Sequence, residues 1–278
     1  MFKNFRKKIG IIGAGNMGSA IAERIKRKYH LFVFDKDKEK VNRFKGVKLS
    51  ENSSELAKNA DVIILAVKPQ DFDFVLGEVK DCWKNKLFVS IAAGITTNYI
   101  EKQLGNVRVV RVMPNMPARI GRGMSCLCKG KFASKGDVIF AKKLFDNLGK
   151  TLILNEDMMD AATAVSGSGP GFWCERLEDK PKDQWEKYSQ EVFIPEFTVA
   201  AEGIGFNRKD AKLLARSTAI GTLVTVQFLG EEPSKFKWSI VSKGGTTEAG
   251  LEALHKGGTL TDAVKAAVKR AKELSRKE

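Results

Sequence analysis

The chain of 278 residues contains few of the side chains that build metal centres and disulfide frameworks. It has two histidines and four cysteines, and no pair of cysteines has the C-x-x-C spacing. Cys126 and Cys128 stand too close together for a zinc knuckle, and we therefore expect no metal site. Buried, reduced thiols are the expected state of the cysteines, as in a cytoplasmic protein.

Long apolar runs are missing as well. No stretch approaches the roughly 18 apolar residues that a membrane-spanning helix needs. Lys3 and Arg6 precede an apolar run, as basic residues do in a signal peptide, but glycines between residues 10 and 18 interrupt the run. We therefore expect no signal peptide, no membrane partner and a cytoplasmic location.

Acidic residues are fewer than basic ones, with 33 aspartates and glutamates against 48 lysines and arginines, so the formal net charge is +15. Such a charge alone favours a nucleic-acid or membrane-surface partner. The lysines are spread along the whole chain, however, and alternate with acids, as in residues 35–40. This dispersal is typical of a solvated surface, so we expect no nucleic-acid partner. Part of the charge can attract an anionic small molecule into a cleft.

A glycine-rich turn stands near the start of the chain, between an apolar run and a helical pattern. Gly13, Gly15 and Gly18 have the spacing G-x-G-x-x-G directly after the apolar residues 9–12. We expect Gly13 to permit a sharp turn, Gly15 to admit a pyrophosphate and Gly18 to let the helix pack on the strand. The helix N-terminus offers free N–H groups to phosphates. The context favours a dinucleotide site over an ordinary glycine-rich turn.

An acidic residue follows the second predicted strand, 31–34, at the position expected of a ribose ligand. Asp35 lies about 20 residues beyond the glycine turn. A further apolar run, 60–67, is typical of a strand buried on both faces. Ligands of open α/β sheets bind beyond the carboxyl ends of the strands. The cofactor-binding residues predicted in this way are Gly13, Gly15, Asn16, Met17, Gly18, Asp35, Lys36, Ala66, Val67, Lys68, Pro69, Ala93 and Gly94.

Two domains are predicted from the order of the elements. Strand and helix patterns alternate through residues 8–155, which indicates an α/β fold with a doubly wound parallel sheet of the Rossmann type. From residue 156 onward we find helical patterns and no convincing β run. We therefore expect a dinucleotide-binding domain at residues 1–157 and an all-helical domain at residues 158–278.

The motifs in this order closely resemble those of the pyrroline-5-carboxylate reductase family, over nearly the whole chain. The resemblance implies an NAD(P)H-dependent oxidoreductase that reduces the C=N bond of 1-pyrroline-5-carboxylate to give proline. It implies also that the helical domain dimerises, that the dimers assemble further and that Asn115 contacts the nicotinamide region. The motifs are the glycine turn, Val67-Lys68-Pro69, residues 90–94, residues 111–115, residues 164–170 and Gly244-Gly245-Thr246-Thr247.

The resemblance places the substrate at a turn before a helix, where N–H groups and the helix dipole suit a carboxylate. It makes Thr247 the catalytic residue, whose hydroxyl reaches the imine nitrogen. A protonated substrate, water and Thr247 all stay open as the proton donor, and helix capping is the structural alternative for Thr246 and Thr247. The implied substrate-binding residues are Ser242, Lys243, Gly244, Gly245, Thr246 and Thr247.

The sequence departs from the family pattern in two places that bear on the substrate. Lys243 stands where the family often has proline, and it either faces the substrate carboxylate or points to solvent. Residues 171–190 form an insertion after the turn at residues 166–170. An extra helical hairpin on the dimer and a lid over the substrate are both open interpretations of this insertion.

Cofactor choice depends on Asp35. A carboxylate there binds a ribose 2′-OH and repels a 2′-phosphate, which favours NADH. The family more often uses NADPH, and Lys36 and Lys38 can hold a phosphate if Asp35 turns away. Two other functions stay open: a reductase of a related cyclic imine or β-hydroxyacid on the same two-domain plan, and a non-catalytic cofactor-binding regulator.

Overall fold

The computed structural model describes residues 7–82 and 84–275, and Lys3 and Arg6 lie outside them. The chain divides into two compact units. Of the described residues, the first unit contains 7–82, 84–112 and 127–147, and the second contains 113–126 and 148–275. The functional division at residue 157 stays a proposal.

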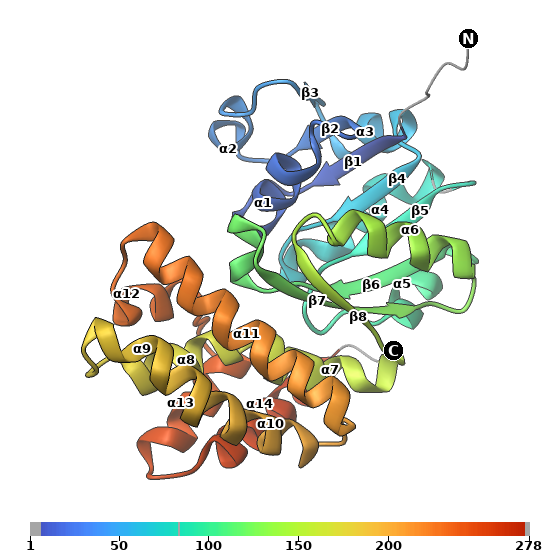
Figure 1. Ribbon diagram of the computed structural model, residues 1–278. Coiled ribbons are helices and arrows are strands. Elements are labelled where there is room, and N and C mark those ends of the chain that lie inside the picture. Colours follow the sequence, from blue (N-terminus) through green and yellow to red (C-terminus); the bar gives the residue numbers. More distant parts are fainter. Residues whose placement is uncertain (1–6, 83, 276–278) are drawn as a thin grey trace. The chain divides into compact units, whose positions relative to one another are not determined.

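An eight-stranded sheet has the strand order β3-β2-β1-β4-β5-β6-β7-β8 (Figure 1). The registered pairs from β3 through β6 are all parallel, which confirms the doubly wound sheet. The chain moves outward from β1 to β3 and then returns to the other side of β1, so the topological switch point lies between β1 and β4. The strands are β1 (Lys8–Ile12), β2 (His30–Phe34), β3 (Lys48–Leu49), β4 (Val62–Leu65), β5 (Leu87–Ser90), β6 (Arg108–Met113), β7 (Gly123–Lys129) and β8 (Gly149–Ile153).

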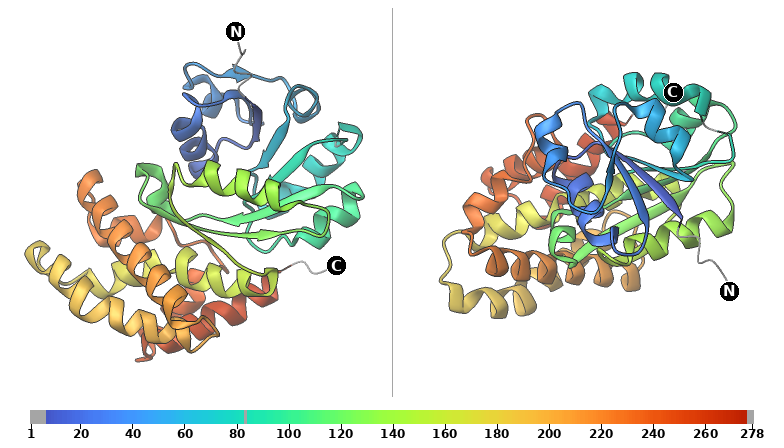
Figure 2. Two further views of the ribbon diagram at one scale, coloured as in Figure 1. Left: turned by 45° about the vertical axis from the view of Figure 1, so that its right-hand side comes forward. Right: turned by 90° about the horizontal axis from the view of Figure 1, so that it is seen from above.

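The side chains of β1 alternate between two helical layers, because successive residues of a strand point to opposite faces. On one face, Ile12 joins a core with residues of α3, α4 and α5, and Gly10 leaves room for Leu56 of α3. Figures 1 and 2 show α1 and α6 on the other face, where Tyr29 meets Phe140 edge to face. The helices are α1 (Asn16–Ile25), α2 (Lys38–Asn42), α3 (Ser53–Asn59), α4 (Phe72–Val79), α5 (Thr97–Leu104) and α6 (Lys135–Phe145).

The second unit is helical from residue 156 through the last described residue, as its sequence predicts. Its longest helix, α11, begins after Asn207, which accepts a hydrogen bond from Asp210 N, and ends at Gly230 with φ +63°. Thr259 caps α14 in a capping box with Asp262. The helices are α7 (Met159–Ala162), α8 (Gly169–Leu177), α9 (Trp185–Tyr188), α10 (Ile194–Glu202), α11 (Arg208–Leu229), α12 (Pro233–Trp238), α13 (Thr246–His255) and α14 (Leu260–Leu274).

Residues 171–190, which we predict to be an insertion, lie in a helical hairpin that α8 and α9 form. Trp173 and Trp185 pack edge to face across it, with ring centroids 6.2 Å apart. The Trp173 indole N–H donates to Ser189 Oγ at 2.8 Å, and the Trp185 indole N–H donates to the Lys180 carbonyl at 2.8 Å. Both indole N–H groups therefore find acceptors inside the hairpin, as buried tryptophans usually do. Its role as a lid stays a prediction.

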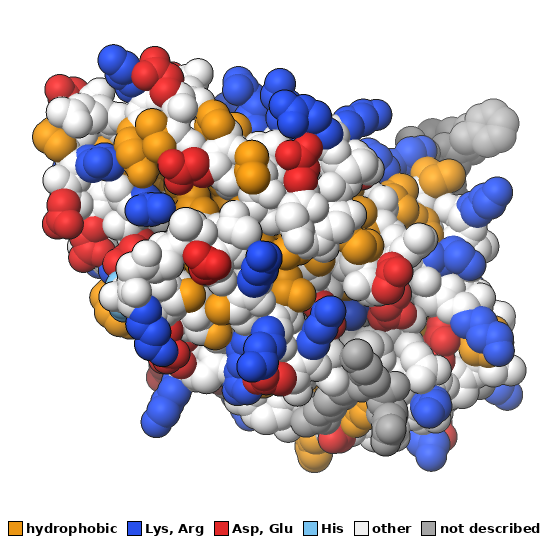
Figure 3. All heavy atoms as spheres, turned by 90° about the horizontal axis from the view of Figure 1, so that it is seen from below, with side chains coloured by type: hydrophobic (Ala, Val, Ile, Leu, Met, Phe, Trp, Pro, Cys, Tyr) orange, Lys and Arg blue, Asp and Glu red, His pale blue; other side chains and the backbone are white. Residues whose placement is uncertain are grey.

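Basic and acidic side chains are interspersed on the face that Figure 3 shows. The described cysteines are all buried and unbridged, as predicted from the sequence. Within residues 7–82 and 84–275, no helix has the length and apolar character needed to cross a membrane.

Candidate functional site

A cavity of about 500 Å³ lies in the first unit, at the carboxyl ends of β1, β2 and β4. This is the edge of the sheet at which the sequence predicts the cofactor, beside the topological switch point. The predicted residues that line it are Gly13, Gly15, Asp35, Lys36, Ala66, Val67 and Lys68.

Two of the three glycines of the turn, Gly13 and Gly18, have the packing roles expected of them. Gly13 has φ +102°, and a Cβ there would stand 2.6 Å from the Ala66 carbonyl oxygen. A Cβ on Gly18 would stand 1.9 Å from the Gly13 carbonyl oxygen, so only glycine fits. A Cβ on Gly15 would meet nothing within 4 Å. The backbone at Gly15 is therefore open to a ligand, and the first N–H groups of α1 have no acceptor inside the helix.

Asp35 is fixed against the glycine turn. Its Oδ2 accepts from the Ala14 N–H at 2.6 Å, and its Oδ1 accepts from the Asp37 N–H at 2.9 Å. Turning the carboxylate away would leave the N–H of the buried Ala14 without this acceptor, at a cost of about 1–3 kcal/mol. The carboxylate therefore stays at the cavity wall with lone pairs left for hydroxyl donors.

One wall of the cavity was not predicted from the sequence. Gln70, Phe74 and Glu78 recur every four residues and so share one face of α4 and the turn before it. Phe74 is 72% exposed, and Glu78 Oε2 is buried without a hydrogen-bond partner among the described residues. The four-residue spacing directly after Lys68-Pro69 is the signal that sequence analysis missed.

Two of the three lysines that line the cavity, Lys36 and Lys40, already pair with acids. Lys36 Nζ lies 2.8 Å from Asp71 Oδ1, and this hydrogen bond raises the pKa of Lys36. Lys40, which also lines the cavity, lies 3.1 Å from Asp37 Oδ2. Carboxylates therefore balance the charges of Lys36 and Lys40, and Lys68 is the third lysine at the cavity.

Some predicted cofactor residues do not line the cavity. Asn115, in the second unit, is buried, and its amide donates to the Ser166 carbonyl at 3.1 Å and accepts from Met124 N–H at 2.8 Å. This amide therefore holds the backbone of its own unit, and a contact with the nicotinamide stays a prediction. The others are Asn16, Met17 and Gly18 in the first turn of α1, Pro69 after β4, and Ala93 and Gly94 after β5.

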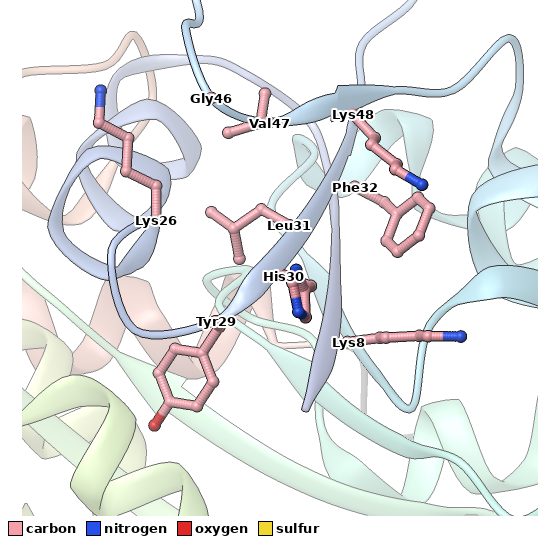
Figure 4. A pocket seen from close by; sticks show the side chains of 9 residues that line it. All are labelled: Lys8, Lys26, Tyr29, His30, Leu31, Phe32, Gly46, Val47 and Lys48. Carbon is pink, nitrogen blue, oxygen red and sulfur yellow. The ribbon is translucent and has the colours of Figure 1, made fainter. Parts of the chain in front are cut away.

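A second hollow of about 500 Å³ lies at the amino ends of β1 and β2 (Figure 4). Lys8, Lys26 and Lys48 rim it, and Leu31 lies near its centre. Because Lys8 and His30 begin their strands, this hollow is at the opposite edge of the sheet from the glycine turn.

The predicted substrate residues, Ser242–Thr247, form a tight turn at the start of α13 in the second unit, and we call these residues the substrate loop. Gly245 is the N-cap of α13, and its N–H donates to the Ser242 carbonyl at 2.9 Å. Gly244 has the left-handed φ of +69° that favours glycine. The first N–H groups of α13 have no acceptor inside the helix, so the loop presents donors to an anion.

The two threonines of the substrate loop pack against α8. Thr246 Oγ1 and Ser168 Oγ are hydrogen-bonded at 2.9 Å. Thr247 is buried, and Gly171 makes room for its methyl group, because a Cβ on Gly171 would stand 2.5 Å from it. Neither hydroxyl caps α13, so capping does not explain these residues. Lys243 is exposed, as are Ser242 and Gly244.

A charged network joins the helices on either side of the substrate loop. Lys237 of α12 donates to Glu175 Oε2 at 2.8 Å and also to Glu178. His255 Nε2 of α13 lies 2.8 Å from Glu175 Oε1. Burial acts to raise the pKa of Glu175, but the hydrogen bonds from Lys237 and His255 bring it below its usual value. Glu175 lies in α8, so the α8–α9 hairpin is tied to the two helices that flank the substrate loop.

Comparison with known proteins matches both units. Residues 8–94 match the family model described as NADP oxidoreductase coenzyme F420-dependent, and residues 191–274 match that described as pyrroline-5-carboxylate reductase dimerisation. The chain is 36% identical to a pyrroline-5-carboxylate reductase of Arabidopsis thaliana, with 96% of this chain and 95% of the relative covered. Its fold is similar to that of the Coxiella burnetii pyrroline-5-carboxylate reductase, at TM-score 0.66, 31% identity and coverage of 98% and 100%. Its fold is also similar to that of the Plasmodium falciparum pyrroline carboxylate reductase with NADP bound. The TM-score is 0.63 and the identity 29%, and the match covers 98% of this chain and 99% of that chain.

Proposed function

The chain belongs to the pyrroline-5-carboxylate reductase family, and we propose that it reduces 1-pyrroline-5-carboxylate to proline with a nicotinamide cofactor. The observation that carries this proposal is that one chain contains two candidate half-sites. They are the cavity at the glycine turn, for the cofactor, and the loop with free N–H donors before α13, for the substrate. A related cyclic imine would use the same two half-sites.

The residues around the cavity fit a dinucleotide. Gly15 leaves open space for a pyrophosphate at the N-terminus of α1. Asp35 has lone pairs for ribose hydroxyls, and the buried Glu78 Oε2 can accept a further hydrogen bond. When bound, the nicotinamide cofactor supplies the hydride, and the protein positions the reactants.

We propose that the substrate loop binds the carboxylate of the imine. The N–H groups of Thr246 and Thr247 are the donors, and the dipole of α13 adds to their attraction. The Thr246 hydroxyl is engaged with Ser168, whereas Thr247 is the residue that we assign to the imine nitrogen. Lys243 adds a cation at the loop.

We propose that the chain prefers NADH to NADPH. A 2′-phosphate brings a charge of about −1.5 to −2 near Asp35, and the cavity lysines Lys36 and Lys40 are already paired with acids. Because the Asp35 carboxylate is hydrogen-bonded to the Ala14 and Asp37 N–H groups, it does not turn away to admit the phosphate.

We further propose that residues 158–278 form the dimerisation and substrate domain and that residues 1–157 bind the cofactor. The match of residues 191–274 to a dimerisation family supports self-association as a homodimer or higher homo-oligomer. Val199, Phe228 and Trp238 are large exposed hydrophobic residues of the helical unit and suit such an interface.

The deciding experiment is steady-state oxidation of NADH and of NADPH with pyrroline-5-carboxylate, measured separately, together with the Kd of each cofactor. We expect turnover, a lower Kd for NADH, and loss of that difference in Asp35→Ser. Absence of turnover in folded, cofactor-binding protein would overturn the proposed substrate. Tighter binding of NADPH would overturn the preference while leaving the reaction intact.

A further inference from the structure

The backbone of Gly244, in the middle of the substrate loop, is held on both sides by side chains from outside the loop. Arg270 of α14 donates from Nε to the Gly244 carbonyl oxygen at 2.7 Å. Glu248 Oε2 accepts from the Gly244 N–H at 2.6 Å. Both polar groups of one exposed glycine are therefore engaged by charged partners, which form the stronger class of hydrogen bond.

The Arg270 guanidinium is itself fixed in place. Its Nη1 lies 2.9 Å from Glu273 Oε2, one turn later on α14. Its Nη2 lies 3.4 Å from the point that a Cβ on Gly244 would occupy, so the guanidinium lies against the loop. The Arg270 side chain is 35% exposed.

Glycine has little conformational preference of its own, so a left-handed glycine in an exposed turn samples other conformations unless its neighbours restrain it. The peptide groups after Gly244 lead directly into Thr246 and Thr247. A rotation at Gly244 therefore moves the N–H groups that bind the substrate carboxylate.

We infer that Arg270 is a positioning residue, which holds the substrate loop in the conformation that binds the substrate carboxylate. This inference rests on the proposed function. Arg270 acts through the Gly244 carbonyl and not on the reacting atoms. A displacement of about 1 Å at such a site lowers catalytic efficiency by up to about 100-fold.

The test compares Arg270→Met, which keeps an apolar stem but no donor, with Arg270→Lys, which keeps a charge and a donor. Lys269→Met is the matched control, because Lys269 is exposed on the same helix and carries the same charge. The measurements are KM and kcat for pyrroline-5-carboxylate, the Kd of the cofactor, and amide hydrogen exchange of residues 240–247.

We expect Arg270→Met to raise KM about tenfold or more and to speed exchange in residues 240–247, while the cofactor Kd stays unchanged. Arg270→Lys should recover most of the loss, and Lys269→Met should behave as the unmodified chain. Two outcomes would overturn the inference. One is unchanged amide exchange of residues 240–247 in folded Arg270→Met, whatever its KM. The other is faster exchange of these residues with an unchanged KM. If the unmodified chain fails to turn over the imine, the proposed function fails, and the exchange result alone decides whether Arg270 holds the loop.

Discussion

Lys237 Nζ of α12 lies 2.8 Å from Glu175 Oε2 of the α8–α9 hairpin, and the Lys237 side chain is only 8% exposed. The same ammonium contacts Glu178, so one buried cation holds two carboxylates. Because α12 leads into the substrate loop, this ion pair connects the α8–α9 hairpin to that loop.

Removal of this cation should destabilise the protein. Lys237→Met leaves two partly exposed carboxylates close together without their shared cation, and we expect a loss of about 2 kcal/mol in the free energy of unfolding. Lys235→Met is the control, because Lys235 is exposed and its nearest acid, Glu231, lies 4.0 Å away. We expect the control to lose about 0.5 kcal/mol or less. Equal losses in urea unfolding would contradict a special role for Lys237.

Acid should weaken the same network. Hydrogen bonds from Lys237 and His255 lower the pKa of Glu175 in the folded chain, against the effect of its burial. A carboxyl whose pKa is depressed by folding contributes its full stabilisation above the unfolded pKa and loses it as pH falls through the folded pKa. Unfolding measured from about pH 6 down to about pH 3 should therefore show a shallower acid loss in Glu175→Gln than in the unmodified chain. If the stability of Glu175→Gln and of the unmodified chain fell in parallel with pH, ionised Glu175 would not be a source of the acid-sensitive stability.

The glycine turn offers a pair of substitutions that separate binding from folding. Gly15→Ala meets no atom within 4 Å, so we expect its Tm to stay near that of the unmodified chain while the cofactor Kd rises at least about tenfold. Gly18→Ala forces a contact of 1.9 Å with the Gly13 carbonyl oxygen, so we expect it to lower Tm. Cofactor titration and thermal unfolding check both. An unchanged Kd in Gly15→Ala would show that the pyrophosphate does not approach there.

Lys243 offers a test of the charge at the substrate loop. Its side chain is exposed at the loop, and we expect Lys243→Ala to raise the KM for pyrroline-5-carboxylate several-fold, with kcat and cofactor Kd little changed. The rise should shrink at high salt, because exposed charges are screened. Lys256→Ala, just after α13, is the control for a change in net charge alone. No change in KM would mean that Lys243 serves only the solvated surface.

The sequence by itself determined the parts of this protein that are encoded locally. The G-x-G-x-x-G spacing, the apolar run at 60–67 and the change to helical patterns from residue 156 onward are local signals. They predict the doubly wound sheet and the helical unit, and the residues predicted to bind the cofactor include seven of the fifteen that line the cavity at the glycine turn. Such patterns can be read from the sequence alone, because a buried strand or a tight turn restricts the residue types at its own positions.

Only the tertiary structure decided which side chains support the two half-sites. Arg270 reaches Gly244 across 26 residues, Thr246 meets Ser168 across 78, and Glu175 meets His255 across 80. Asp35 was predicted as a ribose ligand, but its anchoring by Ala14 N–H becomes visible only when β1 and β2 pair. Each of these contacts joins residues that are far apart in the sequence. The sequence pattern does not reveal such partners, because an arginine or glutamate on a helix surface suits the helix equally well with or without them.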